Sequence, residues 1–240
     1  MEIKSYQLFP SSQRGQKDIG WLKSSFTFSF SDFYNPVKSG FGTLVAFNDD
    51  FVALEQGFGI HPHQNMEIIS ILLQGTMSHK DNMGYNNVIT EGGVQIMSAG
   101  TGLFHEEWNV GNEIVNFLQI WIQPKIQNIK PRYQFRSFPK ENRVNKLVTV
   151  VSSEEGTEHC WINQNTKISL GYFTATSLVQ YKFNHVNKAV FVFAIKGDIT
   201  VNTNMINQRD AIGVWNTGDI EIKAKSDTEF VIIETVINQK

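Results

Sequence analysis

Apolar and polar residues alternate along much of this chain with a period of two. Residues 26–30 read FTFSF, and residues 66–73 and 115–122 are short runs rich in branched and aromatic side chains. Turn-forming clusters of Asn, Asp and Gly separate such runs at residues 48–50, 82–84, 86–87 and 92–93. Period two is the spacing of a strand, and no stretch predicts a helix longer than about two turns. The pattern therefore predicts an all-β protein, a sandwich or barrel of short strands.

The second half of the chain repeats the rhythm of the first. Residues 190–201 resemble residues 68–77, because in both an apolar strand ends at a glycine and another strand follows. The polar and basic stretch 127–143 separates the two copies and is interpreted as a connection. We therefore expect two domains of the same kind, over residues 1–135 and 136–240.

Two pairs of potential metal ligands stand at i, i+2 spacing in the first half. His61 and His63 lie in GIHPH, and His105 and Glu107 lie in HEE. On a strand this spacing points both side chains of a pair to one face. If the two strands lie together, three imidazoles and one carboxylate meet, which is a ligand set for a divalent transition metal with positions left open. With neutral imidazoles, the site with its cation carries a net charge of about +1.

Neighbouring polar residues are alternative ligands. Glu67 lies four residues after His63 and is a rival carboxylate. Glu106 is a second rival, but it alternates to the face opposite His105 and should point away. His79 is expected in a hairpin, as a solvated or hydrogen-bonded residue rather than a ligand.

The second copy lacks the same set of ligands. Aligning the two repeats places His185 opposite His63 but Phe183 opposite His61, and no His pair stands where the second pair of ligands would map. The C-terminal domain is therefore predicted to be a degenerate copy without metal. His159 and His185 are expected to be ordinary polar residues.

Composition narrows the function. An apolar fraction of 41% and a charged fraction of 18% fit a soluble globular protein with a substantial core. The net charge is −2 and no run is rich in Lys or Arg, so direct nucleic-acid binding is not expected. The first residues lack a signal sequence, and no stretch approaches the ~18 apolar residues of a membrane helix. Cys160 is the single cysteine, which indicates a free thiol, and we expect a cytoplasmic protein.

At these residues the chain resembles the pirin family of the cupin superfamily, in particular the bacterial pirin-like quercetin 2,3-dioxygenases. The match is dense in the N-terminal half and looser in the C-terminal half. It is carried in order by residues 20–24, 27–30, 56–63, 66–68, 75–76, 79–81, 95–102, 105–107, 119–124 and 131–133.

The resemblance implies an all-β bicupin of two antiparallel β-barrel or jelly-roll domains, with the metal in the N-terminal one. It implies the ligands His61, His63, His105 and Glu107, the same four reached from spacing, and it places Glu67 beside the site without direct ligation. Iron(II) is the expected cation; nickel, manganese, cobalt, copper or zinc can occupy such ligands too, since affinity alone discriminates poorly.

The activity implied is quercetin 2,3-dioxygenation. Dioxygen adds across the C2–C3 bond of a flavonol, the ring opens and carbon monoxide leaves. Glu107 is the candidate catalytic base for the flavonol 3-hydroxyl. Phe58, Phe104 and Trp108 either line an apolar pocket for the flat substrate or pack in the core. The implied partners are a small aromatic substrate and dioxygen, and the family favours a monomer.

Two other functions remain open at this stage. One is an iron-binding, redox-sensitive regulatory or interaction protein without turnover, which would bind a protein partner. The other is a cupin enzyme with a different substrate, because cupins host many chemistries. The chain departs from the family pattern at Phe26, Phe104 and Glu106, positions expected near the pocket mouth, and these departures bear on the substrate rather than on the metal.

Overall fold

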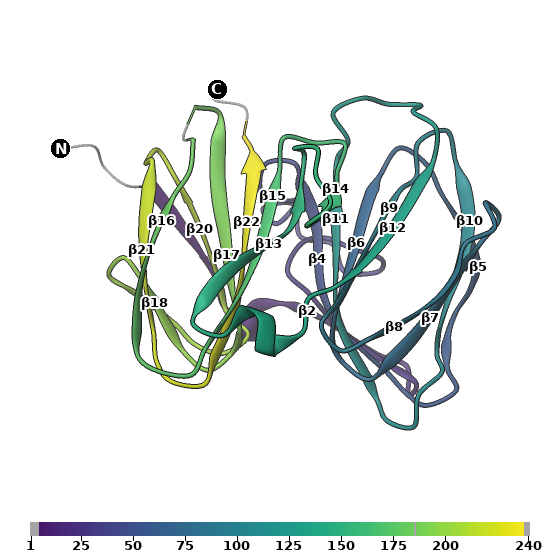
Figure 1. The fold of residues 1–240 in the computed structure, drawn as a ribbon, viewed down its shortest axis with the longest axis horizontal. Helices are drawn as coiled ribbons and strands as arrows, with labels where there is room; N and C mark the ends of the chain where they lie inside the picture. Colours follow the sequence, from purple (N-terminus) through teal and green to yellow (C-terminus); the bar gives the residue numbers. More distant parts are fainter. Residues whose placement is uncertain (1–4, 185, 238–240) are drawn as a thin grey trace.

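The computed structural model describes residues 5–184 and 186–237. Two similar halves lie side by side, and each pairs a seven-stranded sheet with a four-stranded sheet (Figure 1). The two sheets of a half form a jelly roll and do not close into a continuous barrel. The prediction of an all-β protein with two jelly-roll domains is confirmed. His185 lies outside the described residues.

The N-terminal half contains both pairs of candidate ligands. Its larger sheet runs in the order β12 (Arg132–Ser137), β9 (Gly93–Ser98), β6 (Glu67–Gln74), β11 (Val115–Ile122), β4 (Leu44–Val52), β3 (Leu22–Phe26) and β2 (Gly15–Asp18). Its smaller sheet runs in the order β5 (Gly57–His63), β10 (Leu103–Asn109), β7 (Thr76–Asp81) and β8 (Asn86–Thr90).

The C-terminal half repeats this arrangement. Its larger sheet runs in the order β1 (Ser5–Phe9), β20 (Ala211–Trp215), β17 (Lys188–Lys196), β22 (Thr228–Val236), β15 (Lys167–Phe173), β13 (Lys146–Ser152) and β14 (Cys160–Trp161). Its smaller sheet runs in the order β16 (Ser177–Lys182), β21 (Asp219–Ala224), β18 (Ile199–Val201) and β19 (Asn204–Ile206). Within the described ranges, the helices are two short 3₁₀ turns, η1 (Ser11–Gln13) and η2 (Lys140–Arg143). In the part of the chain that the structure describes, no helix is long and apolar enough to cross a membrane.

The first strand of the chain joins the sheet of the opposite half. β1 pairs with β20, so it occupies in the C-terminal half the edge position that β12 occupies beside β9 in the N-terminal half. β1 therefore lies within the predicted domain 1–135 by sequence but extends the other sheet. β12 continues two residues past Phe135. This exchange of an edge strand ties the halves together through backbone hydrogen bonds.

An apolar core between the halves joins their larger sheets. Phe47 of β4 packs against Phe191 and Phe193 of β17, with ring centroids 5.0 and 4.8 Å apart. Residues from both halves form one continuous buried cluster here, so burial of apolar surface holds the halves together. Arg209 adds a polar contact, since its Nη1 lies 3.0 Å from each carboxylate oxygen of Asp49.

Candidate metal centre

Strands β5 and β10 bring the two predicted pairs together. They are antiparallel neighbours in the smaller sheet, and His105 lies directly opposite His61 while Leu103 lies opposite His63. Because residues directly opposite one another share a face, all three imidazoles are on the interior face of the sheet. His105 and Glu107 are only 3% and 2% exposed. The shared face expected from i, i+2 spacing is thus present in the structure.

A β-bulge separates the two ligand positions on β10. The register shifts between His105 and Glu107, so that Glu107 lies opposite Phe58 rather than Gly59. Gly57 permits this close approach, because a Cβ atom there would overlap the backbone carbonyl of Glu107. Such bulges re-aim side chains beside functional sites.

The three imidazoles form one cluster, and Glu107 belongs to a second one that overlaps it. The ring centroids of His61, His63 and His105 are 4.3–5.0 Å apart. Their nearest ligand atoms all lie within 4.8 Å of one another, and so do those of His79, His105 and Glu107. His105 is shared between the groups. The predicted four residues therefore adjoin one another through His105, with His79 as an unexpected neighbour.

Two of the imidazoles, His63 and His105, are held in the neutral form that metals bind. Burial, with the neighbouring histidines, lowers the pKa of His105 to about 2, and burial with His61 lowers the pKa of His63 to about 4. His61 Nδ1 lies 2.7 Å from the carbonyl oxygen of Gly59, so it donates there and leaves Nε2 for a ligand. His105 Nε2 is buried and has no hydrogen-bond partner. A divalent cation at this atom would satisfy it, so the residues fit the metal.

Glu107 is a buried carboxyl with an oriented partner. Gln95 Nε2 donates a hydrogen bond to Glu107 Oε1, and the hydroxyl of Tyr133 donates to Gln95 Oε1 over 3.0 Å. Burial raises the pKa of Glu107 to about 7 despite the bond from Gln95, and the charge of Asp50 adds to the rise. A cation would compete with that proton for the carboxylate.

Several neighbours of the site were not anticipated from the sequence. Trp121 meets His63 edge-to-face at 5.1 Å, and Phe30 packs on Trp121 at 5.0 Å. Gln95 and Tyr133 hold Glu107 as described above. Period two places Trp121, Gln95 and Tyr133 each on one face of a strand, but which face points inward depends on strand pairing that the sequence does not specify.

The two rival carboxylates lie elsewhere. Glu67 is on the face of β6 turned toward the other half, where its Oε2 accepts hydrogen bonds from Ser98 Oγ at 2.7 Å and Asn163 N at 3.2 Å. The expectation that Glu67 sits beside the metal site is therefore wrong, because strand alternation turns it away. Glu106 points outward as expected, and Trp108 Nε1 donates to its Oε2 at 3.1 Å.

The predicted aromatic lining divides into three different environments. Phe104 lines a recess of about 470 Å³ that reaches His63. Phe58 packs edge-to-face on Trp21 at 5.5 Å, as a core residue. Trp108 is 37% exposed and alternates to the outer face of β10, so it does not line the site. Among the family departures, Phe26 is buried against Phe30 rather than near a mouth.

His79, His159 and the cysteine have ordinary partners. His79 is buried and hydrogen-bonded to Asp81 rather than solvated. His159 Nε2 lies 2.9 Å from the carbonyl oxygen of Glu154. Cys160 is a buried free thiol, and burial raises its pKa to about 12.

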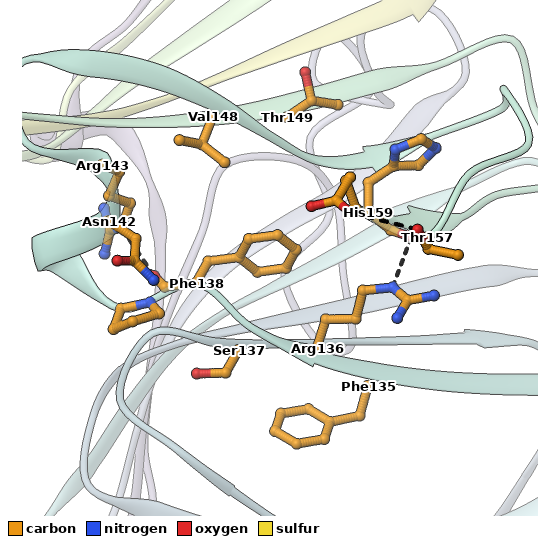
Figure 2. Close-up of a pocket in the computed structure, with 12 residues that line it drawn as sticks. Phe135, Arg136, Ser137, Phe138, Asn142, Arg143, Val148, Thr149, Thr157 and His159 are labelled. Atoms are coloured by element: carbon orange, nitrogen blue, oxygen red, sulfur yellow. Dashed lines mark hydrogen bonds between the residues drawn. The ribbon is translucent and has the colours of Figure 1, made fainter.

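A separate cavity lies between the halves (Figure 2). It has a volume of about 680 Å³ and is lined by β12, η2, β13 and the segment that precedes β14, with Phe138, Arg136 and His159 among its walls. None of the four candidate ligands lines it.

Two family models together match most of this chain. Residues 8–122 match the family model "Pirin", and residues 149–235 match "Quercetinase C-terminal cupin domain". The chain is 34% identical over 227 residues to a quercetin 2,3-dioxygenase of Escherichia coli K12, covering 93% of this chain and 96% of that protein. A pirin-like protein of Caulobacter vibrioides is 33% identical over 226 residues, covering 94% and 97%.

A solved structure matches nearly the whole chain. The crystal structure of the bacterial pirin YhhW from Escherichia coli, in complex with nickel(II), superposes with a TM-score of 0.92 at 32% identity and covers 98% of this chain and all of that one. The sequence match spans both halves of the chain. This chain therefore belongs to the pirin family and consists of two cupin domains.

Proposed function

We propose that this protein is a metal-dependent dioxygenase that cleaves a flavonol such as quercetin. The observation that carries the proposal is the meeting of neutral imidazoles and a carboxylate on one interior face, with His105 Nε2 buried and unpartnered. His61, His63, His105 and Glu107 would hold the cation. Iron(II) is our first candidate, and a relative's structure contains nickel(II). The name of the Escherichia coli relative supports the choice of substrate.

The chemistry divides between the cation and the protein. When bound, the cation supplies Lewis acidity to the flavonol oxygen and an open position for dioxygen. Glu107 would accept the proton of the flavonol 3-hydroxyl, because it is the carboxylate of the proposed ligand set and would lie beside the oxygen that the cation binds. Gln95 fixes Oε1 of that carboxylate and so leaves Oε2 to face the cation or the proton.

The recess beside His63 supplies a place for a flat substrate. Its volume of about 470 Å³ is in the usual range for small-molecule sites. Phe104 lines the recess, and Trp121 packs against His63 from the interior.

The test is oxygen consumption and carbon monoxide release on quercetin. Protein is reconstituted anaerobically with iron(II), nickel(II), manganese(II), cobalt(II) or copper(II), and the metal content of each sample is measured. We expect turnover with at least one cation and none in His105→Ala. Lys80→Gln, a change on the outer face of the same sheet, is the matched control and should keep full activity.

Two outcomes would contradict the proposal. Stoichiometric metal with no oxygen uptake on any flavonol would favour another cupin substrate or a redox-sensitive binding protein. Equal turnover by wild-type protein and metal-free His105→Ala would show that the cluster is not the catalytic site.

A further inference from the structure

A third pair of residues at i, i+2 spacing lies beside the candidate ligands. His79 and Asp81 are on β7, with Asp81 directly opposite His105 and His79 directly opposite Glu107. Both side chains are buried, at 1% and 8% exposed, on the same interior face of the sheet. Neither belongs to the proposed ligand set.

Asp81 acts as an acceptor on both of its oxygens. Its Oδ1 accepts the backbone N–H groups of Met83 and Tyr85 at 2.9 and 3.1 Å. Its Oδ2 faces His79 Nε2 at 3.0 Å. Because a carboxylate can only accept, His79 Nε2 must carry the proton of this bond.

The other nitrogen of His79 faces a proposed ligand. His79 Nδ1 lies 3.4 Å from His105 Nδ1, and two ring nitrogens at this separation form a hydrogen bond only when one of them is protonated. With the proton of a neutral His79 on Nε2, its Nδ1 is the acceptor and His105 Nδ1 is the donor. The bare nitrogen of His105 is then Nε2, the atom that is buried without a partner.

We propose that Asp81 and His79 form a hydrogen-bond relay that holds His105 in the Nδ1-protonated tautomer and keeps its Nε2 lone pair for the metal. The relay rests on the metal site proposed above and makes His79 a positioning residue rather than a ligand. Metal-bound histidines generally donate their second ring N–H to an oriented acceptor, which fixes tautomer and ring direction. His61 uses a backbone carbonyl for this purpose, whereas His105 uses another imidazole.

Tyr133 holds the relay in place. Its ring stacks on His79 with centroids 4.2 Å apart and planes 16° apart, which fixes the plane in which Nδ1 points. The same tyrosine bonds Gln95, the partner of Glu107. One side chain thus supports both buried ligands of β10.

His79 itself is poorly placed to bind the cation. Its atoms lie within 4.8 Å of those of His105 and Glu107, but both of its nitrogens face other partners. Ligation through Nδ1 would break the bond to His105, and ligation through Nε2 would break the bond to Asp81.

Three variants separate the relay from packing. His79→Leu removes the acceptor at similar volume, whereas His79→Asn keeps an oxygen near the position of Nδ1. Asp81→Asn places an N–H₂ group toward His79 Nε2, because the backbone donors of Met83 and Tyr85 retain the amide oxygen. His79 must then carry its proton on Nδ1, which faces His105. Lys80→Gln lies between the two positions on the outer face and is the matched control.

The readouts are nickel(II) affinity and the tautomer of His105. Affinity is measured by competition with a chromophoric chelator, alongside the thermal unfolding temperature of each metal-free variant. We expect His79→Leu and Asp81→Asn to weaken nickel binding about 10- to 100-fold, as loss of such partners generally does, with His79→Asn and Lys80→Gln near wild type. Long-range ¹H–¹⁵N spectra of the metal-free protein should show His105 protonated on Nδ1 in wild type and altered in Asp81→Asn.

Each alternative result overturns the relay. If His79→Leu binds nickel(II) as tightly as wild type, His79 has no part in positioning His105. If His79→Leu and His79→Asn lose the same affinity, His79 is a ligand or a packing residue. An Nε2-protonated His105 in the metal-free wild type would contradict the assigned tautomer. If His79→Leu does not fold, the nickel affinity of Asp81→Asn and the wild-type spectrum still test the relay. The spectrum needs neither metal nor flavonol, so failure of the proposed dioxygenase activity would leave this test standing.

Discussion

The two halves share an architecture but fill their interiors differently. β10 and β21 hold the same position in their four-stranded sheets. On the inward face β10 carries His105 and Glu107, where β21 carries Ile220 and Ile222, both fully buried. One interior collects neutral imidazoles and a carboxylate, and the other is a continuous apolar cluster.

The difference shows that the fold does not depend on its polar interior. A jelly roll needs alternating side chains and two sheets, and branched apolar residues fill it with greater stability than buried polar groups do. The buried histidines and glutamate should therefore make the N-terminal half less stable than an apolar interior would, and in our proposal they hold a cation. In this proposal the N-terminal half carries the chemistry, whereas the C-terminal half and the junction contain packed apolar side chains.

The largest effect is expected from removing a ligand. His105→Ala, or His63→Ala, should lower metal affinity by more than the ~10- to 100-fold typical of losing a ligand's partner, and should abolish any dioxygenase activity. Most of the fold should remain, because the apolar cores are untouched. Wild-type protein should gain thermal stability on adding nickel(II), and the variants should not.

Calorimetry with and without metal checks this result. Ile222→Ala is the counterpart in the other half, and its unfolding temperature should still rise with metal. An equal rise in His105→Ala would place the metal elsewhere in the molecule.

The converse effect is expected in the C-terminal half. Ile222→Ala removes a fully buried side chain from the apolar cluster and should lower the free energy of unfolding by about 2–5 kcal/mol. Nickel affinity should be unchanged, because the residue is in the opposite half. Denaturant unfolding and metal titration of the same variant check both statements. A loss of metal affinity without a loss of stability would contradict the division of roles.

Sequence and structure agree where local pattern decides the outcome. Period two predicted the strands, and i, i+2 spacing placed His61, His63, His105 and Glu107 on one face. The exchange of β1 into the C-terminal sheet was not predictable, since strand partners far apart in sequence are chosen by tertiary packing.

The same limit explains the errors around the site. Alternation alone orients a side chain relative to its neighbours but not toward a particular half. Sequence spacing therefore predicts Glu67 near the candidate ligands, whereas in the structure it faces the junction. The sequence assigns no role to Tyr133, which stacks on His79 and bonds Gln95, the partner of Glu107.

Two buried glutamates, Glu67 at the junction and Glu234 inside the C-terminal half, give a pH-dependent comparison. Burial raises the pKa of Glu67 to about 7, despite hydrogen bonds from Ser98 and Asn163. For Glu234 burial also acts to raise the pKa, but the hydroxyl of Tyr181 and the ammonium of Lys188 outweigh it and hold the pKa below its ordinary value. As the pH rises, the two carboxyls should therefore change the free energy of unfolding in opposite directions.

The sign follows from proton uptake. Between its ordinary pKa of 4.5 and about 7, Glu67 holds a proton in the folded state only, so its contribution to the free energy of unfolding falls as pH rises through this window. Glu67→Gln cannot show this loss. Its free energy of unfolding, relative to that of wild type, should therefore rise by about 1–3 kcal/mol from pH 5 to pH 8.

Glu234 is the matched control for this prediction. Its stabilising contribution is present above the ordinary pKa and is lost as pH falls through the folded value, so Glu234→Gln should be destabilised at pH 5 and at pH 8 alike. Urea unfolding of metal-free protein at both pH values provides the measurement. A wild-type minus Glu67→Gln difference that does not change with pH would refute the raised pKa of Glu67.

The smallest effect is expected one residue from a ligand. Glu106 and Glu107 are adjacent on β10, but Glu106 faces outward, where it accepts from Trp108 and lies 3.8 Å from Lys80. Exposed ion pairs contribute little, so Glu106→Gln should change stability by no more than about 0.5 kcal/mol and leave nickel affinity near wild type.

Glu107→Gln should weaken nickel binding strongly, because an amide replaces the only carboxylate of the proposed ligand set. Parallel nickel titrations of the two variants test the assignment of faces, since comparable losses in both would mean that β10 does not present its side chains to the metal in the alternating order described here.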